Sequence, residues 1–385
     1  MTLTVHHYFP LGSDNVGDAL VAHAIRCAAL RHFGPARFVD MPVNDRLQGH
    51  DRCIGLRGDN LRRSNDEADL IIVGGSNLLE PRKPKRGLWP GQDNWLWGVF
   101  TDEASLRSIR RPLLLLGMGT GSSFGKPVRA YPEAAQREIR LLHQRAFAAA
   151  VRDVTTAKQL ASIGVDAACT GCPVTFLTNR EICSHASDGP LIVSFPPSRI
   201  VRRRRGKAFM RGAMRYIERL RDAGVPLLVT LHETRDLEIA DDWVPKGVPV
   251  FHTEDVDELI ARYETCRGVI GFRLHAALLA LGLGKPIVPV GVDWRGRGFI
   301  DTFALRDVAI RPGRLGQFRK LDRQTARLLQ GEPAFYERLR REKARFLGRF
   351  DRFLREAAER FRSLVPIAGT DGRAVGSKGE TRRAG

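Results

Sequence analysis

The chain has 385 residues, 43% of them hydrophobic, and its 62 Lys and Arg against 43 Asp and Glu give a formal net charge of +19. This composition excludes a wholly disordered or fibrous chain, and the length exceeds what one core normally fills, so two domains are expected. No apolar run reaches the roughly 18–20 residues of a membrane-spanning helix, and no leader peptide is recognisable. Six cysteines in so long a chain do not indicate a disulfide framework, so a cytoplasmic protein is expected.

Short apolar runs alternate with amphipathic segments through residues 1–180, which we expect to form the first domain. In chain order, the pattern predicts strand 3–9, helix 18–32, strands 37–41, 70–73 and 113–116, helix 132–147, strand 148–152, helix 155–163 and strand 165–169. Runs such as 113–116 are apolar throughout, as in strands that are buried on both faces of a parallel sheet. The alternation therefore predicts a parallel sheet flanked by helices.

A polar, turn-rich stretch at 179–189 marks the expected domain boundary, and the alternation restarts in a second domain at 190–310. The pattern predicts strand 191–195, helix 206–223, strand 227–231, helix 236–243, strand 248–252, helix 255–266, strand 268–272, helix 274–282 and strand 287–292. One or two charged helices are predicted within 333–365, followed by a disordered tail at 366–385. Ligands of such sheets bind beyond the carboxyl ends of the strands, here between the two halves.

Three glycine-bearing loops follow strands of the first domain. Their notable residues are Asn15, Gly17, Asp18, Gly74, Gly75, Ser76, Gly117 and Gly119. Taken singly, each loop is explained by a tight turn, and the first also by a helix cap. Together, at one edge of a sheet, they predict a surface that a ligand can approach closely. The glycine spacing is not that of a dinucleotide site, and no phosphate-loop lysine follows.

Arginine and histidine stand where buried strands end. Arg152, followed by Asp153, forms either a structural ion pair or a fork of donors for carboxylate or phosphate. Arg273 ends another strand, and His275 lies in the first turn of the next helix, where free amides and the helix dipole favour anions. This pair predicts a site for an anionic substrate beside an acid–base group. The alternative for His275 is a hydrogen bond to a nearby carbonyl.

Other features carry less information. The C-x-x-C at Cys169 and Cys172 lacks further ligands, so a buried turn is expected rather than zinc or redox chemistry, and no metal site is expected elsewhere. His232 and Glu233 follow a strand and are candidate contributors to the cleft.

The aromatic residues of a Gly/Pro-rich stretch either stack on a sugar or pack under a loop; they are Trp89, Trp95 and Trp97. The run Arg202, Arg203, Arg204 and Arg205 either contacts phosphates or lipid head groups or is simply solvated.

In this order and spacing, the motifs resemble the polysaccharide pyruvyl transferase family. The likeness extends to Asp293 and rests on Asn15-Val16-Gly17-Asp18, Gly74-Gly75, Gly117-Met118-Gly119, Arg152-Asp153, Thr170-Gly171-Cys172-Pro173 and Phe272-Arg273-Leu274-His275. The chain departs from the family pattern at Ser76, where a third glycine is common, and at Thr120 or Gly121, where proline is common. The resemblance implies an α/β fold of two Rossmann-like domains facing a cleft, similar to B-type glycosyltransferases, with C-terminal helices.

The resemblance also implies an activity: transfer of pyruvate from phosphoenolpyruvate onto two sugar hydroxyls as a ketal, with release of phosphate. By position, Arg273 and His275 would hold this donor and supply a proton, and Arg152 would bind the anionic donor. Asn15 and Gly17 would line the cleft with the other glycine loops, and Asp18 is the candidate acceptor of a hydroxyl proton. No cofactor besides the donor substrate, and no metal, is expected.

Two other functions stay open. A B-type glycosyltransferase that uses a sugar nucleotide would share the architecture, and a non-catalytic module could bind nucleic acid through Arg202–Arg205 and the tail. As partners we expect phosphoenolpyruvate and a sugar or lipid-linked glycan acceptor, and no nucleic acid. A peripheral contact of the arginine run with the anionic inner face of the membrane is left open, as is the oligomeric state.

Overall fold

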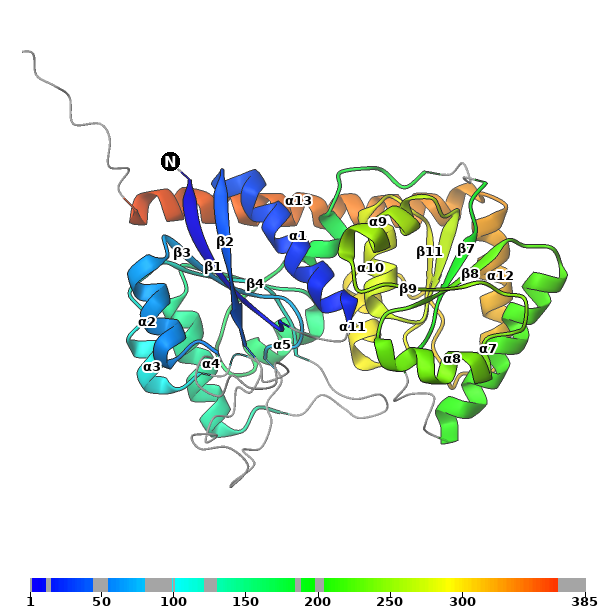
Figure 1. Cartoon of the computed structure of the whole chain (residues 1–385), viewed down its shortest axis with the longest axis horizontal. Coiled ribbons are helices and arrows are strands. Elements are labelled where there is room, and N and C mark those ends of the chain that lie inside the picture. The colour runs from blue at the N-terminus through cyan, green and yellow to red at the C-terminus, as the bar shows by residue number, and fades with distance from the viewer. Residues whose placement is uncertain are drawn as a thin grey trace, which may run out of the picture.

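The computed structural model describes residues 2–11, 15–43, 55–79, 99, 101–120, 130–183, 188–197 and 204–365. Among the predictions above, those for the tail at 366–385, for Arg202 and Arg203 and for the three tryptophans lie outside the described residues. The chain forms two α/β lobes side by side, each built around its own parallel sheet (Figure 1). None of the described helices is long and apolar enough to cross a bilayer.

The N-terminal sheet has the strand order β2-β1-β3-β4-β5-β6, and every neighbouring pair is parallel. Its strands are β1 (Leu3–Phe9), β2 (Ala36–Pro42), β3 (Leu70–Gly74), β4 (Leu113–Met118), β5 (Ala148–Val151) and β6 (Ala168–Cys169). The helices of this lobe are α1 (Val16–Phe33), α2 (Gly58–Glu67), α3 (Glu103–Arg107), α4 (Glu133–Arg145), α5 (Val154–Ala161) and the 3-10 turn η1 (Pro173–Phe176). Successive residues of β3 enter two separate hydrophobic cores, which explains its unbroken apolar run.

The C-terminal sheet has the order β11-β10-β7-β8-β9 and is also parallel. Its strands are β7 (Leu191–Ser194), β8 (Leu227–Leu231), β9 (Val250–His252), β10 (Gly268–Gly271) and β11 (Ile287–Pro289). The helices of this lobe are α7 (Arg204–Asp222), α8 (Leu237–Trp243), α9 (Val256–Glu264), α10 (Leu274–Gly282), α11 (Trp294–Thr302), α12 (Gln317–Leu329) and the 3-10 turn η2 (Thr234–Asp236). The strand order reverses between β1 and β3 in one sheet and between β7 and β10 in the other. Ligands of such sheets bind at these reversals.

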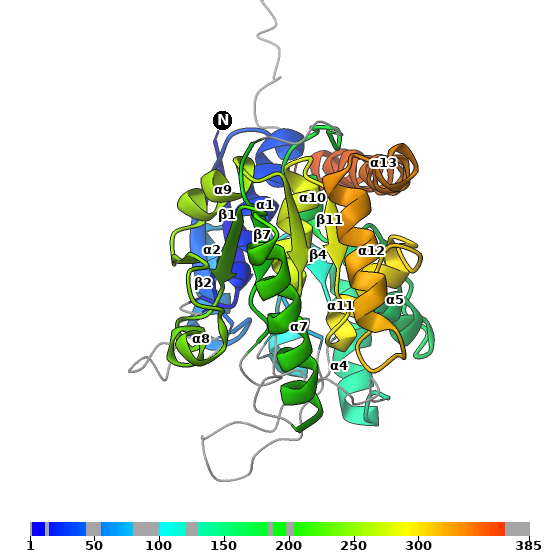
Figure 2. The ribbon, with the colours of Figure 1, turned by 90° about the vertical axis from the view of Figure 1, so that its right-hand side faces the viewer.

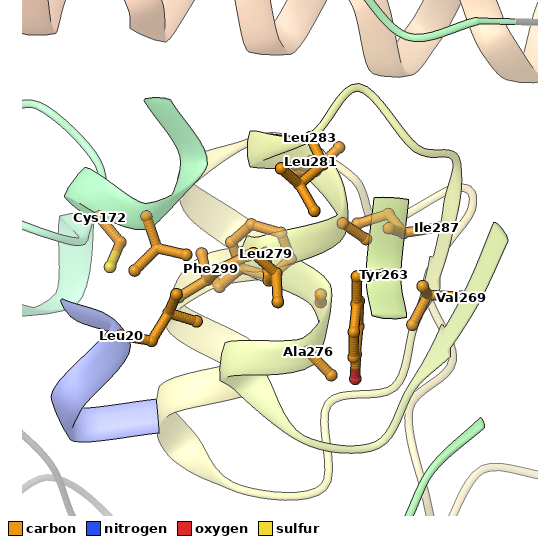
Figure 3. Close-up of a cluster of buried hydrophobic side chains, with 14 of the residues drawn as sticks. Leu20, Cys172, Tyr263, Val269, Ala276, Leu279, Leu281, Leu283, Ile287 and Phe299 are labelled. Atoms are coloured by element: carbon orange, nitrogen blue, oxygen red, sulfur yellow. The ribbon is translucent and has the colours of Figure 1, made fainter. Parts of the chain in front are cut away.

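The two lobes share one hydrophobic core. Helix α10 lies at its centre and contributes Leu279, while Leu20 comes from α1, Cys172 from the segment before η1 and Phe299 from α11 (Figure 3). All four side chains are nearly inaccessible to water. The lobes are therefore held in one arrangement by continuous apolar packing where α10 meets the N-terminal lobe.

Helix α13 (Pro333–Leu364) is one continuous helix of 32 residues that runs along both lobes (Figure 1). Figure 2 views it end-on at one edge of the molecule, beside α12. Phe350 stacks on Phe176 of η1 with ring centroids 4.8 Å apart, and Phe361 meets Phe33 of α1 at 5.6 Å. Because its apolar face packs on the N-terminal lobe and its start on the C-terminal one, α13 fastens the two lobes together.

Most predicted elements are present, with ends shifted by a few residues. Helices α2, α3, α11 and α12 are additional to the prediction, and the strand expected over 165–169 is reduced to β6, of two residues. Helix α11 contains two glycines, which lower helix propensity. It forms because Asp293 caps its first turn, accepting from the Gly296 N–H at 2.9 Å, and because Phe299 and Ile300 are buried.

Candidate active site

The imidazole of His275 lies where the lobes meet. His275 is the second residue of α10, and the backbone of Gly17 in the first turn of α1 packs directly on its ring, so that a β-carbon at Gly17 would overlap Nδ1. The Val16 N–H donates to the His232 carbonyl at 3.1 Å, and Asn15 forms a β-bridge with Glu233. These contacts hold the start of α1 against the carboxyl end of β8.

The first turn of α1 has the cap that its sequence predicts. The Asn15 side chain accepts from the Gly17 N–H at 3.0 Å, and the Asp18 N–H bonds the Asn15 carbonyl at 2.9 Å. Asp18 is itself buried and lies within electrostatic reach of the Arg295 guanidinium. The helix-cap explanation is therefore confirmed for this loop, and contact of the loop with a ligand stays a prediction. The role of Asp18 as a proton acceptor stays a prediction.

Arg273 is buried, and all three of its guanidinium nitrogens are engaged. Nη1 donates to Glu233 Oε1 at 2.7 Å, Nη2 contacts Asp236 Oδ2, and Nε donates to the Phe195 carbonyl at 3.1 Å. Burial alone would raise the pKa of Glu233, but the charges of Arg273 and Arg235 outweigh it and hold that pKa at about 2. Arg273 thus ties together the ends of β7, β8 and β10. That it also holds the donor stays a prediction.

Arg152 links three strand ends of the N-terminal lobe. Its Nε lies 3.4 Å from Asp153 Oδ2, and its Nη2 contacts the Asn77 side chain after β3. A β-carbon at Gly119, after β4, would overlap the guanidinium. The structural ion pair is therefore present, yet Nη1 of Arg152 has no hydrogen-bond partner among the described residues. Among the described residues, one edge of this guanidinium is thus without a protein acceptor.

The other glycine loops face protein rather than the imidazole. A β-carbon at Gly75 would lie 2.9 Å from Val21 of α1, and one at Gly117 would lie 2.7 Å from Pro173. Gly74 is similarly close to α1, at Ile25. The positive φ of Gly117, 67°, accompanies a register shift in β4 that turns the end of the strand toward Arg152.

Ser76 follows these glycines in the loop after β3. Its φ is 54°, and its carbonyl accepts from the Gly119 N–H at 3.0 Å, which joins this loop to the one after β4. These contacts explain why the loops have this shape without a ligand. Direct substrate binding by Ser76, Gly74, Gly75, Gly117 and Gly119 stays a prediction.

Arg295 is a residue of this site that the sequence reasoning missed. It lies in the first turn of α11, and Asp293 holds it: Nε and Nη2 both donate to Asp293 Oδ2, at 2.8 and 2.6 Å. Arg295 is the charged group with the largest effect on His275. A signal was present, since Arg295 follows strand β11 and an Asp cap just as His275 follows β10 and Arg273.

The electrostatic field at His275 is positive. Burial lowers the pKa of His275, and the guanidiniums of Arg295, Arg152 and Arg273 lower it further, to about 3, against a smaller opposing effect of Glu233. The imidazole is therefore neutral in the free protein at neutral pH. Within the part of the chain that the structure describes, neither ring nitrogen of His275 has a hydrogen-bond partner, so the carbonyl-bonded alternative is not found there.

The remaining candidates lie around this centre or away from it. Glu233 is part of the site through Arg273, and His232 lies beside it with Nε2 3.1 Å from the Tyr263 hydroxyl. Cys169 and Cys172 are free thiols, and burial raises the pKa of each to about 11, in keeping with the expected turn. The described residues include no group of three His, Cys, Asp or Glu side chains placed to hold a metal. Metal-independent chemistry stays a prediction.

Solved structures with a similar architecture include a UDP-N-acetylglucosamine 2-epimerase and a sucrose-phosphate synthase. A protein assigned as a UDP-N-acetylglucosamine 2-epimerase from Listeria monocytogenes gives a TM-score of 0.57 at 12% identity, covering 94% of this chain and 97% of that one. Sucrose-phosphate synthase from Thermosynechococcus elongatus gives 0.52 at 12%, covering 94% and 99%, and S. aureus MnaA with UDP gives 0.51 at 12%, covering 88% and 91%. At such identities the likeness shows the fold alone, which is the two-domain fold of B-type glycosyltransferases and related epimerases.

Within that fold class the chain is a transferase. The family model for polysaccharide pyruvyl transferase matches residues 15–293, and the chain belongs to this family. The match begins at Asn15, the cap of α1, and ends at Asp293, the cap of α11. No curated protein sequence matches the chain.

The contact between Gly17 and His275 predicts a sharp effect of Gly17→Ala. The added methyl group would have to displace the imidazole or part the lobes, and a shift of about 1 Å can reduce turnover about a hundredfold. We expect that loss in transferase activity, measured as kcat/KM. Gly348→Ala is the control, because a β-carbon there meets open space on α13. That variant should keep full activity and gain about 0.5–1 kcal/mol of stability. Full activity of Gly17→Ala would contradict the contact.

The ion pairs of Arg273 predict that Arg273→Met is unstable. The substitution leaves the carboxylates of Glu233 and Asp236 buried without the guanidinium, which costs about 3–5 kcal/mol for such pairs. Denaturant unfolding measures the loss. Arg306→Met is the control, since Arg306 pairs with Asp301 at the exposed surface, where solvent screens the pair and its loss should change stability little. If Arg273→Met unfolds like the control, Arg273 has no structural role and direct donor binding becomes its better explanation.

Proposed function

We propose that the chain transfers pyruvate from phosphoenolpyruvate onto two hydroxyls of a sugar, forming a ketal and releasing phosphate. The acceptor is a polysaccharide or its lipid-linked precursor. Membership of the polysaccharide pyruvyl transferase family supports the class of reaction. A single observation supports phosphoenolpyruvate as the donor. The His275 imidazole lies in the positive field of three guanidiniums, which come from both lobes.

The site suits a small donor that carries two anionic groups. Helices α1, α5, α10 and α11 all begin around His275, and the positive dipole ends of helices favour anions. Arg152 adds donors from the N-terminal lobe, and its open Nη1 can bind carboxylate or phosphate. The donor would be held between the lobes, with its reacting carbons at the imidazole.

The reaction needs one proton donor and one proton acceptor. His275, protonated when the donor binds, gives its proton to the methylene carbon of phosphoenolpyruvate, which leaves positive charge on the neighbouring carbon. A sugar hydroxyl attacks this carbon and loses its proton to Asp18. A second hydroxyl then forms the other C–O bond as the C–O bond to phosphate breaks. Of the two hydroxyl protons, one restores the proton that His275 gave to the new methyl group, and the other leaves with phosphate.

A sugar-nucleotide glycosyltransferase is the second candidate. One of the neighbours of similar fold was solved with UDP, and an arginine pair could hold a diphosphate. This candidate rests on fold alone, whereas pyruvyl transfer also has the family match. Thermal-shift measurements separate the two, because a sugar nucleotide would stabilise the chain in one case and phosphoenolpyruvate in the other.

The test of the function is incubation with phosphoenolpyruvate and lipid-linked glycan precursors of the host. We expect phosphate release together with the mass gain of one pyruvyl ketal on the glycan. His275→Asn should abolish both while its thermal unfolding stays near that of the parent, because the ring has no described hydrogen bond to lose. His23→Asn, on α1 and half-buried, is the histidine control and should remain active. Turnover by His275→Asn would refute its role as the acid.

The field at His275 also predicts proton uptake when the donor binds. The donor's negative charges would offset the guanidiniums, so the pKa of His275 should rise from about 3 and the imidazole should take up a proton. Calorimetric titration with phosphoenolpyruvate in two buffers of different ionisation enthalpy measures this uptake, which should grow as the pH is lowered from 7 to 6. His275→Asn should lose it. Equal uptake in parent and variant would assign the proton to another group.

A further inference from the structure

A strongly basic surface of the C-terminal lobe takes no part in the site described above. Between Asp188 and Glu218, and again between Asp307 and Asp322, the chain contains no acidic residue. These stretches include most of α7 and the first turn of α12. Four of their cationic side chains are exposed and form no ion pair with any described residue. They are Lys207, Arg211, Arg314 and Arg319. The charge becomes mixed only toward the end of α7, where Glu218 and Asp242 line a groove against α8.

The two basic stretches lie together because α7 and α12 are parallel neighbours (Figure 2). A β-carbon at Gly212 of α7 would overlap the ring of Phe318, in the first turn of α12. Further along both helices, Tyr216 of α7 lies within electrostatic reach of Asp322 of α12. The contacts thus advance in the same direction along both helices, so the basic starts of α7 and α12 lie at the same end of the lobe.

This end of the lobe is the edge of the sheet that also carries His275. Helix α7 follows β7, and the loop 311–316 follows Ile310, which pairs in parallel with Val290 just beyond β11. The Gly291 N–H donates to the Ile310 carbonyl at 2.9 Å, which fixes the start of this loop at the strand end. His275 follows β10 of the same parallel sheet. Because the carboxyl ends of parallel strands share one edge, the basic stretches and the imidazole lie on the same side of the lobe.

The tip of this loop presents an apolar side chain to water. Leu315 is fully exposed, whereas the next most exposed large hydrophobic side chain among the described residues, Leu364, is 54% exposed. Gly313 and Gly316, with φ of 86° and 73°, stand on either side of Arg314 and Leu315 and allow the tight turn that exposes them. A leucine at a loop tip beside exposed cations suits an anionic bilayer, where the head groups attract the cations and the leucine enters the apolar layer.

We propose that the basic end of the C-terminal lobe, formed by Lys207, Arg211, Arg314, Leu315 and Arg319, docks on an anionic lipid bilayer with Leu315 inserted below the head groups. Nucleic acid would attract the same cations, but its phosphate backbone offers no apolar layer for Leu315. Docking in this way brings the sheet edge that carries His275 to the membrane surface. A lipid-linked acceptor would be within reach there; only this last step rests on the proposed function.

Binding is measured by co-sedimentation of the full chain with vesicles of phosphatidylcholine, alone or with phosphatidylglycerol added. We expect binding to the anionic vesicles only, and weaker binding as the salt concentration is raised. Arg314→Gln/Arg319→Gln should weaken binding about thirtyfold, since each cation near such a surface contributes about 1 kcal/mol. Leu315→Gln should weaken it about tenfold, because the side chain no longer enters the apolar layer.

Matched controls lie on α13, across the molecule from the start of α7 (Figure 1). Arg352→Gln/Arg355→Gln removes two exposed arginines, and Leu364→Gln removes an exposed leucine. Both controls should bind the anionic vesicles as the parent chain does. Every substituted side chain is exposed, so thermal unfolding of all four variants should stay near that of the parent.

Absence of binding to anionic vesicles overturns the proposal, as does equal binding to neutral ones. Parent-like binding by Leu315→Gln and by Arg314→Gln/Arg319→Gln also overturns it. If Leu315→Gln instead changes the molar mass of the chain in solution, the surface joins copies of this chain. Salt-sensitive binding to duplex DNA without vesicle binding would assign the cations to nucleic acid. The vesicle assay contains neither donor nor acceptor, so its failure leaves the proposed function standing.

Discussion

The packing of the Gly17 backbone on the His275 ring is the constraint on which the rest of the site depends. The imidazole belongs to one lobe and the surface that covers Nδ1 belongs to the other, so the site is complete only when the lobes are together. Any side chain at position 17 would occupy the space of the ring. The shared core around α10 and the span of α13 hold the lobes in the required arrangement. The environment of the imidazole is thus a property of the whole chain rather than of a single loop.

Helix α10 keeps His275 in this position because both ends of the helix are fixed. At its start, Arg273 is bonded to the ends of neighbouring strands. At its end, the Gly282 carbonyl accepts from the Thr178 hydroxyl at 2.6 Å and from the Lys343 ammonium of α13 at 3.4 Å. A cation at a helix C-terminus is favourable, although burial lowers the pKa of Lys343 to about 8. Since α10 cannot slide or tilt freely, His275 is held in position before any ligand arrives, as preorganised catalysis requires.

The sequence predicted the sheets well because strands buried on both faces must be apolar throughout, as β3 and β4 are. It also located His275 at a helix start, since strand, short turn and helix follow directly from the local pattern. It could not reveal the partners of Arg273, because Glu233 lies 40 residues away along the chain. Sequence pattern likewise does not distinguish a glycine that faces a ligand from one that faces a proline, as Gly117 does. For Arg295 the sequence carries the strand-and-cap pattern, but its nearness to the imidazole follows from the topology.

The way in which the arginines are neutralised explains how the site can remain positive without a ligand. A buried guanidinium needs a carboxylate, and a carboxylate that interacts with the guanidinium alone would cancel its charge. Asp153 and Asp293 each have a second role. Each also caps a helix, Asp153 by accepting from the Thr156 N–H and Asp293 by accepting from the Gly296 N–H. Part of their negative charge is balanced by the positive helix ends. The guanidiniums of Arg152 and Arg295 are therefore oriented by carboxylates without being fully compensated, which is why the net effect of the surrounding charges on His275 remains that of cations.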